Sequence, residues 1–350
     1  MLPEERLRLG IAAALLLLVY GTALVFAVRS LAGAIRRRRG GAGAPALRPA
    51  LRRARVAVYA LAGLGVACAA YARLVEPYWP EVTHARVESA KLSRPIRIAH
   101  ISDVHSDPVA RLEPRLPDLI AAERPDVIVF TGDAINSPDG AANFRTLMKR
   151  LAAIAPTYAV RGNWDVWYWS GIDLFGGTGV TELSGTAVQL PGRADVWIAG
   201  VPVGELDAVP GMLDAIPRGA VSLFLYHYPD EIEDVARRGV DLYLAGHTHG
   251  GQVALPLYGA LVTLSRHGKR FESGLYRVGG TALYVNRGIG MEGGSAPRVR
   301  FMARPEVTII ELEPAQAPPS QGTESSSDVM RRRSDGDSRN ASCLPTRSRA

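Results

Sequence analysis

The sequence has very little cysteine. Only Cys68 and Cys343 occur among 350 residues, which is too few for a disulfide framework or a thiolate zinc site. Acidic residues are missing from the stretch 29–55, which holds nine arginines, so most of the formal charge of +7 comes from one short region. A nucleic-acid-binding protein would spread its basic residues over a binding face. The composition therefore argues against a nucleic-acid partner, and a hydrophobic content of 47% argues against a disordered chain.

Two long runs near the N-terminus contain no charged residue. The first is Leu9 to Val28, and as a helix its twenty residues would be about 30 Å long, the thickness of a bilayer core. The second is Val56 to Ala72, at the short end of the range for a membrane span. We predict a membrane region at 1–75 with one or two transmembrane helices, at about 9–28 and 56–72. A cleaved signal peptide is the alternative for the first run, and a surface helix for the second.

The arginine-rich loop expected at 29–55 sets the predicted orientation. Basic loops stay on the cytoplasmic side of a membrane, and they also attract anionic lipid headgroups. If both runs cross the membrane, the chain after residue 75 lies outside. If only the first crosses, that part stays in the cytoplasm. We predict a cell-membrane location and favour the outward orientation.

The rest of the chain alternates short apolar runs with helical patterns. Residues 76–95 read as a connector, 96–313 as one domain, and 314–350 as a disordered tail rich in Pro, Ser, Arg and Asp. Helices are expected at 114–123, 140–154 and 229–238. Alternation of strand and helix predicts an α/β fold with parallel pairing, and the strand-like runs within 251–312 suggest a second sheet. The six earlier strand candidates are 96–103, 126–133, 157–163, 196–201, 221–227 and 241–249.

Metal-binding side chains gather where these apolar runs end. Each short motif alone is weak, but five of them follow in order, and four of the seven histidines of the chain are among them. Ligands at the carboxyl ends of strands converge in α/β folds. Without sulfur, the set suits Mn, Fe, Zn or Mg, and it predicts a site for two divalent metal ions. The motifs are Asp103-x-His105, Gly132-Asp133, Gly162-Asn163, His227 and Gly246-His247-x-His249.

In order and spacing, these motifs resemble the signature of the calcineurin-like metallophosphoesterases. The resemblance covers about 96–312, and the hydrophobic head is similar to the membrane-linked bacterial branch, which includes phosphodiesterases and a UDP-2,3-diacylglucosamine diphosphatase. It implies a four-layer α/β/β/α sandwich. It also implies that Asp103, His105 and His249 hold one metal, that Asn163, His227 and His247 hold the other, and that Asp133 bridges both. A hydroxide between the metals would then attack phosphorus in line.

The third motif departs from the family pattern. Where the family has Gly-Asn-His-Asp, this chain has Gly162-Asn163-Trp164-Asp165. The family histidine contacts substrate and protonates the leaving group, and an indole cannot deliver a proton. Loss of a general acid costs 10²–10⁴-fold, and the cost is smaller when the leaving group is already stable. We therefore expect a phosphoanhydride or activated diester substrate, unless His100 or His267 replaces the acid.

The motifs also suggest catalytic and substrate-binding roles. Asp133, Asn163, Trp164 and Asp165 are the candidate catalytic residues, and Trp164, Gly251 and Arg287 are the candidate substrate contacts. Gly251 would allow close backbone approach, whereas Arg287 would hold a phosphate or simply form a surface ion pair. An aromatic cluster, Trp164 to Phe175, would admit an acyl chain, meet the membrane, or only pack a cap.

Together these features predict a membrane-anchored phosphoesterase. The expected partners are a phosphorylated small molecule or lipid and the membrane. The alternative is a binding protein of the same fold that keeps the metals but has no catalytic activity. Hydrolysis of bis(p-nitrophenyl) phosphate by the wild type would discriminate between the two.

Overall fold

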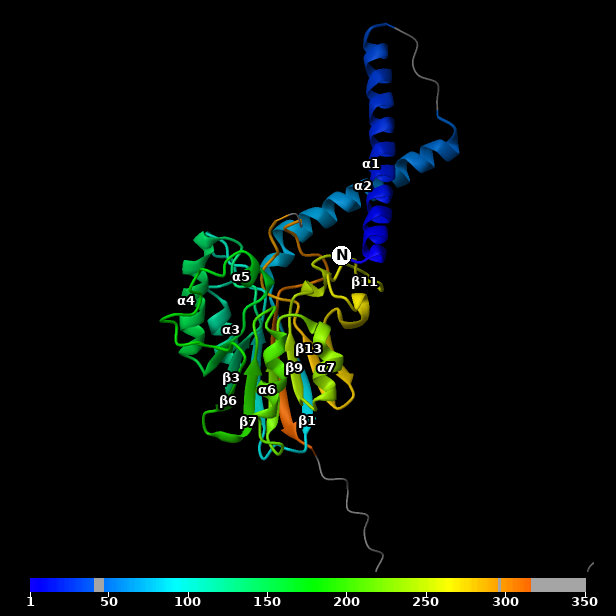
Figure 1. Ribbon diagram of the computed structural model, residues 1–350. Coiled ribbons are helices and arrows are strands. Elements are labelled where there is room, and N and C mark those ends of the chain that lie inside the picture. Colours follow the sequence, from blue (N-terminus) through cyan, green and yellow to red (C-terminus); the bar gives the residue numbers. More distant parts are fainter. Residues whose placement is uncertain (41–46, 295–296, 316–350) are drawn as a thin grey trace, which may run out of the picture. The chain divides into compact units, whose positions relative to one another are not determined.

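The computed structural model describes residues 1–40, 47–294 and 297–315 (Figure 1). The chain is divided into a unit from Met1 to Ala315 and a second unit from Gln316 to Ala350. Nearly all of the expected tail at 314–350 lies outside the described residues. The first unit contains two long N-terminal helices followed by a domain with two sheets.

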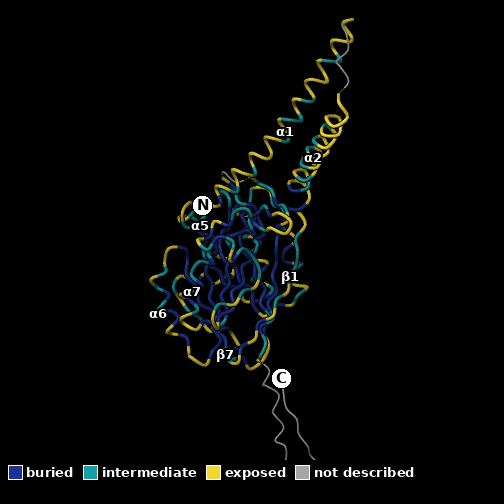
Figure 2. The backbone as a smooth tube through the Cα atoms, turned by 90° about the vertical axis from the view of Figure 1, so that its right-hand side faces the viewer, coloured by how far each residue is buried: buried dark blue, intermediate teal, exposed yellow. Residues whose placement is uncertain are grey.

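Two long helices precede the domain. They are α1, Pro3–Arg38, and α2, Pro49–Leu74, and their side chains are mostly exposed (Figure 2). Both are long and apolar enough to cross a membrane, which is weak evidence that they do. The predicted loop at 29–55 is wrong in extent, because residues 29–38 continue α1 and residues 49–55 belong to α2. Arginine is a good helix former, and basic residues in the last turn of α1 complement the helix dipole.

The expected connector at 76–95 contains a strand. A short 3₁₀ helix, η1 at Glu76–Tyr78, leads from α2 into β1, Glu81–Ser89. Strand β1 pairs in parallel with β14, Glu306–Pro314, at the other end of the domain sequence. Strand β1 was not expected, because its polar and apolar residues alternate at the edge of a sheet and do not form the fully apolar run that marks the other strands.

Each of the two sheets has six strands. The first has the order β1-β14-β2-β3-β4-β5, and the second has the order β12-β13-β9-β8-β7-β6. A second sheet was expected within 251–312, but it begins earlier, at β6, while β14 returns to the first sheet. The remaining strands of the two sheets are β2 (Ile96–Ile101), β3 (Val127–Phe130), β4 (Thr157–Ala159), β5 (Thr181–Glu182), β6 (Thr186–Leu190), β7 (Arg193–Gly200), β8 (Val221–Leu225), β9 (Leu242–Ala245), β12 (Gly274–Val278) and β13 (Thr281–Val285).

Three apolar cores separate four layers. Alternate residues of β2 and β3 face opposite ways: Ile98 and Val129 pack between the sheets, whereas Ile101 and Phe130 pack against helices. The outer face of the first sheet is covered by α3 and α4, and that of the second by α6 and α7. The predicted α/β/β/α sandwich is therefore confirmed. The covering helices are α3 (Leu116–Ala122), α4 (Ala141–Ala152), α6 (Val209–Asp214) and α7 (Ile232–Arg237).

Candidate metal centre

The loops that follow β2 and β3 bring two buried aspartates together. Asp103 follows β2 and Asp133 follows β3, and these strands are parallel neighbours whose carboxyl ends meet at one edge of the sheet. The amide of Asp103 donates to the carbonyl of Gly132 over 2.8 Å, and the amide of His105 donates to the carbonyl of Asp133 over 3.0 Å. These backbone bonds fix the two carboxylates relative to each other.

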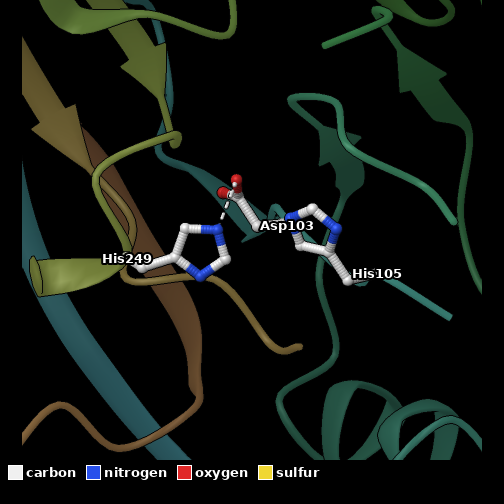
Figure 3. Close-up of side chains that lie close together, drawn as sticks. All are labelled: Asp103, His105 and His249. Atoms are coloured by element: carbon white, nitrogen blue, oxygen red, sulfur yellow. Dashed lines mark ion pairs between the residues drawn. The ribbon is translucent and has the colours of Figure 1, made fainter. Parts of the chain in front are cut away.

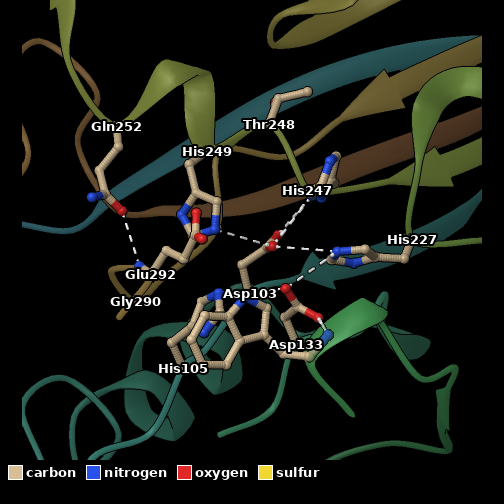
Figure 4. Close-up of polar contacts among 12 residues, drawn as sticks. Asp103, His105, Asp133, His227, His247, Thr248, His249, Gln252, Gly290 and Glu292 are labelled. Carbon is tan, nitrogen blue, oxygen red and sulfur yellow. Dashed lines mark hydrogen bonds and ion pairs between the residues drawn. The ribbon is translucent and has the colours of Figure 1, made fainter. Parts of the chain in front are cut away.

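Three histidines lie around the aspartates. His249 Nε2 is 3.3 Å from Asp103 Oδ1, and His105 Nε2 is 3.5 Å from Asp133 Oδ2 (Figures 3 and 4). His227, which follows β8, has its Nε2 3.4 Å from Asp133 Oδ2 and 3.9 Å from Asp103 Oδ1. Two overlapping groups could each hold a metal ion: Asp103, His105 and His249, and Asp103, Asp133 and His227.

Unpartnered ligand atoms support metal binding at this place. Among the described residues, Asn163 Oδ1, His227 Nε2 and both ring nitrogens of His105 are buried without a hydrogen-bond partner. His227 Nδ1 lies 2.7 Å from the carbonyl oxygen of Thr131, so Nδ1 carries a proton and Nε2 faces the carboxylates. Buried polar atoms are rarely left without a partner. Divalent cations would supply a partner for Asn163 Oδ1, for His227 Nε2 and for one ring nitrogen of His105, and the donor set fits them.

Burial and charge shift the pKa values of two of these histidines in opposite directions. Burial lowers the pKa of His105 to about 4, so its imidazole is neutral near pH 7, as a metal ligand must be. For His227, burial lowers the pKa but the carboxylates of Asp133 and Asp103 outweigh it and raise it to about 9. Without a metal, a proton on His227 therefore offsets the negative charge of the two aspartates.

Backbone strain is concentrated at the same residues. Five of the ten described non-glycine residues with positive φ belong to the predicted ligand set. Each such residue costs about 1–3 kcal/mol, which a fold retains where the geometry serves a function. The five are Asp103 (φ 48), His105 (φ 44), Asp133 (φ 60), His247 (φ 70) and His249 (φ 52).

His247 and Asn163 complete the predicted ligand set less directly. The ring of His247 stands edge-on to that of Tyr228, with centroids 4.3 Å apart, and its Nε2 is 3.4 Å from the carbonyl oxygen of Leu264. Its amide donates to the carboxylate of Asp103 over 3.1 Å. Asn163 is the first residue of α5, Asn163–Trp167. Both residues line the cavity described below, and His247 does not belong to the two groups of closely spaced ligand atoms.

Asp165 holds the backbone of the site. Its Oδ2 accepts from the amides of Asp133 and Gly162, and its Oδ1 accepts from the amide of Ala134, each over 2.9 Å. Burial and the charge of Asp133 raise its pKa to about 7. Because both oxygens serve backbone amides, these contacts give Asp165 a positioning role, and its catalytic role stays a prediction.

Gly162 is required by the close approach of two loops. A Cβ added there would lie 2.2 Å from Asp133 Oδ1 and 2.5 Å from the Asp133 amide, although its φ of −85° suits any residue. We expect Gly162→Ala to displace Asp133, lower the free energy of unfolding by about 1–3 kcal/mol and reduce turnover. Thermal unfolding and steady-state kinetics would measure both effects. Gly219→Ala, with open space around it, is the matched control, and unchanged kinetics in Gly162→Ala would contradict this account.

A cavity of about 320 Å³ opens beside Asp133. Trp164 lines it and stands edge-on to His105, with ring centroids 5.4 Å apart. Exposed Trp167 and Tyr168 add an apolar wall. The full lining is Met1, Asp133, Asn163, Trp164, Trp167, Tyr168, Tyr228, Asp230, His247, His249, Leu264 and Glu292.

Glu292 is a lining residue that sequence analysis missed. Burial raises the pKa of its carboxyl group, and the Gln252 side chain accepts a hydrogen bond from its amide over 2.9 Å. Buried Arg300 secures the same segment by donating to the carbonyl oxygens of Gly290 and Ala303, each over 2.8 Å. No motif marked Glu292, because it lies in an irregular segment that only the fold brings to the site.

The two other predicted substrate contacts lie elsewhere. The Arg287 guanidinium pairs with Glu81 over 2.7 Å and with Glu306 over 3.3 Å. Arg287 therefore forms ion pairs, which was the alternative to its holding a substrate phosphate. Gly251 packs against Ala260, and a Cβ added to Gly251 would lie 2.4 Å from the Cβ of Ala260. Neither residue lines the cavity.

The alternative proton donors also lie outside the cavity. His100 Nε2 is 2.9 Å from the Thr131 hydroxyl in the core, and His267 Nε2 is 3.1 Å from the Asp230 carbonyl oxygen. Neither histidine is among the residues that line the cavity.

Known proteins share this domain. Residues 96–251 match the model of the family described as calcineurin-like phosphoesterase. The chain is 31% identical over 259 residues to the uncharacterized metallophosphoesterase YkuE of Bacillus subtilis, covering 69% of this chain and 89% of the relative. It is 32% identical over 263 residues to the phosphodiesterase YaeI of Escherichia coli, covering 69% and 92%.

The chain belongs to the calcineurin-like phosphoesterase family. This confirms the resemblance seen in the motifs, and it makes the candidate metal centre that of a family of hydrolases acting on phosphoester bonds. A zebrafish relative, named a transmembrane protein with metallophosphoesterase domain, is 27% identical and is aligned over 67% of this chain and 58% of its own length. In this phosphoesterase the candidate site of Asp103, His105, Asp133, His227 and His249 is suited to divalent metal ions.

Proposed function

We propose that this chain is a membrane-anchored phosphoesterase that uses two divalent metal ions to hydrolyse a phosphodiester or phosphoanhydride bond. The observation that carries the proposal is the convergence of unpartnered, buried ligand atoms on Asp103 and Asp133 beside an open cavity. When bound, the ions would activate water and neutralise charge on phosphoryl oxygens. Manganese is the metal with which we would begin.

Each residue of the site would have a specific role in metal or substrate binding. Asp103, His105 and His249 would hold one ion, and His227, His247 and Asn163 the other, with Asp133 shared between them. Asp165 would keep Asp133 in place through the backbone amides it binds. Trp164 and Tyr168 would exclude water from one side of the substrate.

A membrane anchor is supported by the two apolar helices and their ends. The start of α1 and the short helix η1 that follows α2 both contact the rest of the domain. Glu5 accepts from the Thr263 amide over 2.8 Å, and Glu76 accepts from the amides of Met302 and Ala303 over 2.9 and 2.6 Å. If both helices cross, the domain lies on the side of the membrane opposite the arginines of 36–39 and 48–55. We therefore propose that the domain faces outward.

The proposed activity is tested with bis(p-nitrophenyl) phosphate and added Mn²⁺. Full-length wild type in detergent should release p-nitrophenol, and Asp133→Ala should not. If the wild type binds metal but shows no turnover, the alternative of a non-catalytic binding protein is favoured. The observation in favour of that alternative is the replacement of the family histidine by Trp164.

The rate of hydrolysis should depend strongly on the leaving group of the substrate. Trp164 cannot donate a proton to a departing alkoxide, so we expect UDP-linked diphosphates and aryl diesters to be hydrolysed about 10²-fold or more faster than alkyl phosphomonoesters. Rates measured across a series of leaving groups of rising pKa would show a steep decline. Equal rates across the series would contradict the expectation, and Glu292→Gln would then show whether that carboxyl supplies the proton.

A further inference from the structure

An exposed apolar hairpin projects from the domain. Strands β10, Ala254–Leu255, and β11, Gly259–Ala260, form a short antiparallel pair. At its tip Leu257 is fully exposed and has a φ of +63°, and Leu255 and Tyr258 are also exposed. A leucine in a strained conformation with its side chain in water contributes no packing energy to the domain. The tip is therefore better explained by an apolar partner.

The hairpin is tied to the start of α1. The guanidinium carbon of Arg8 lies 5.9 Å from the centroid of the Tyr258 ring. One turn earlier, Glu5 is fully buried and accepts from the amide of Thr263 over 2.8 Å and from its hydroxyl over 3.2 Å. Arg8 is the last charged residue before the twenty-residue apolar run of α1. The hairpin tip is thus held at the level where a membrane-spanning α1 would enter the bilayer.

The hairpin is tied independently to the end of α2. Val253, at its base, forms a β-bridge with Phe301, whose ring is 6.3 Å from that of Tyr71 near the end of α2. Arg73 closes the apolar run of α2, and Glu76 binds the backbone next to Phe301. The first residues of the α1 run and the last residues of the α2 run therefore both lie near this hairpin.

Aromatic and basic side chains also occur where the two helices join the domain. Trp79 is exposed, and the guanidinium carbon of Arg304 lies 4.2 Å from its ring centroid. Lys269 Nζ lies 4.4 Å from the Tyr258 ring centroid. Exposed Met302 follows Phe301. Tryptophan, tyrosine and basic residues with apolar neighbours are the composition favoured at a lipid headgroup interface.

From these contacts we infer that the hairpin 255–258, with Trp79 and Met302, docks the domain on the bilayer surface and inserts Leu257 among the lipids. The inference rests on the proposed membrane anchorage and extends it to the domain itself. The partner is the lipid interface of the membrane that holds α1 and α2.

The docked hairpin would place the cavity close to the membrane surface. Leu264, which follows the hairpin, donates its amide to Glu5 over 3.3 Å and also lines the cavity with Met1 and Trp167. The start of α1 is therefore part of the cavity wall. A phosphodiester or diphosphate in an amphipathic molecule would reach the site while its apolar portion stays in the bilayer.

Environment-sensitive fluorescence in vesicles tests the docking. Full-length protein in which Cys68 and Cys343 are replaced by serine would carry one new cysteine, labelled with a nitrobenzoxadiazole probe, in phosphatidylcholine–phosphatidylglycerol vesicles. Leu257→Cys reports on the hairpin, and Leu17→Cys reports on α1. Arg218→Cys is the matched control, because this exposed residue precedes β8 at the end of the sheet opposite the metal ligands.

The inference predicts that probes at positions 257 and 17 show blue-shifted emission and are quenched by nitroxide lipids. A probe at position 218 should show neither effect. If the probe at position 17 is quenched but the probe at position 257 is not, the docking is overturned and the membrane anchorage is still supported. Quenching at none of the three would overturn the anchorage, and the docking with it.

A functional readout complements the fluorescence. Leu257→Asp should slow hydrolysis of a phosphodiester presented in vesicles and leave hydrolysis of soluble bis(p-nitrophenyl) phosphate unchanged, because Leu257 does not line the cavity. Equal rates for wild type and variant on the vesicle substrate would contradict docking. The soluble substrate controls for misfolding.

Discussion

Asp133→Asn should lower kcat/KM for bis(p-nitrophenyl) phosphate by about 10³-fold or more. Asp133 Oδ2 lies within 3.5 Å of the Nε2 atoms of both His105 and His227, so its charge acts on one histidine of each group of ligands. Metal ions contribute several kcal/mol to the stabilisation of a phosphoryl transition state, and each 1.36 kcal/mol corresponds to a factor of ten in rate. An amide in place of the carboxylate would weaken binding of both ions.

The same variant should not unfold the protein. In the absence of metal, burial raises the pKa of Asp133, but the neighbouring His227 and His105 outweigh it and hold that pKa below its usual value, so the charged form is favoured. Thermal unfolding of the metal-free variant should therefore occur below the Tm of the metal-free wild type, but still as a single cooperative transition. Asp139→Asn, the same change at an exposed position six residues away, is the control. Turnover within tenfold of the wild type in Asp133→Asn would contradict the assignment.

Removal of metal should lower the Tm of the wild type by about 8–16 °C. A ligand present at a thousand times its Kd stabilises the folded state by about 4 kcal/mol. For a domain of this size each kcal/mol corresponds to about 2–4 °C. The physical reason is the loss of partners for the buried carboxylates and for the unpartnered atoms of Asn163 and His227.

Calorimetry with and without a chelator measures this shift. The chelator saturated with Mn²⁺ beforehand is the control, and readdition of Mn²⁺ should restore the original Tm. In Asp133→Asn the chelator should have little effect, since that variant binds metal poorly. A Tm of the wild type that does not respond to chelation would mean that the site does not hold metal.

Much of the fold follows from short-range patterns in the sequence. The apolar runs at β2, β3 and β8 are buried on both sides, so their composition identifies them, and polar residues after each run mark the edge where they meet. Strand β6 was not expected, because it is an edge strand with a mixed pattern. The pairing of β1 with β14 joins the two ends of the domain, and no local signal encodes it.

The site divides in the same way. Asp103, Asp133, His105, His227 and His249 follow strands and could be named from motifs, and the structure brings them together. Glu292 could not be named, because its position depends on Gln252 and Arg300 rather than on a neighbouring strand. The motif suggested Asp165 as a catalytic residue, since a sequence cannot show that its oxygens bind the amides of Asp133, Ala134 and Gly162.

The metal content of the active protein tests the central claim most directly. Full-length wild type, purified without chelator and supplied with Mn²⁺, should contain about two divalent ions per chain by inductively coupled plasma mass spectrometry. Asp133→Asn should contain clearly fewer, and turnover should rise with occupancy as metal is returned to the stripped protein. Full turnover by protein that holds no divalent metal would contradict the account.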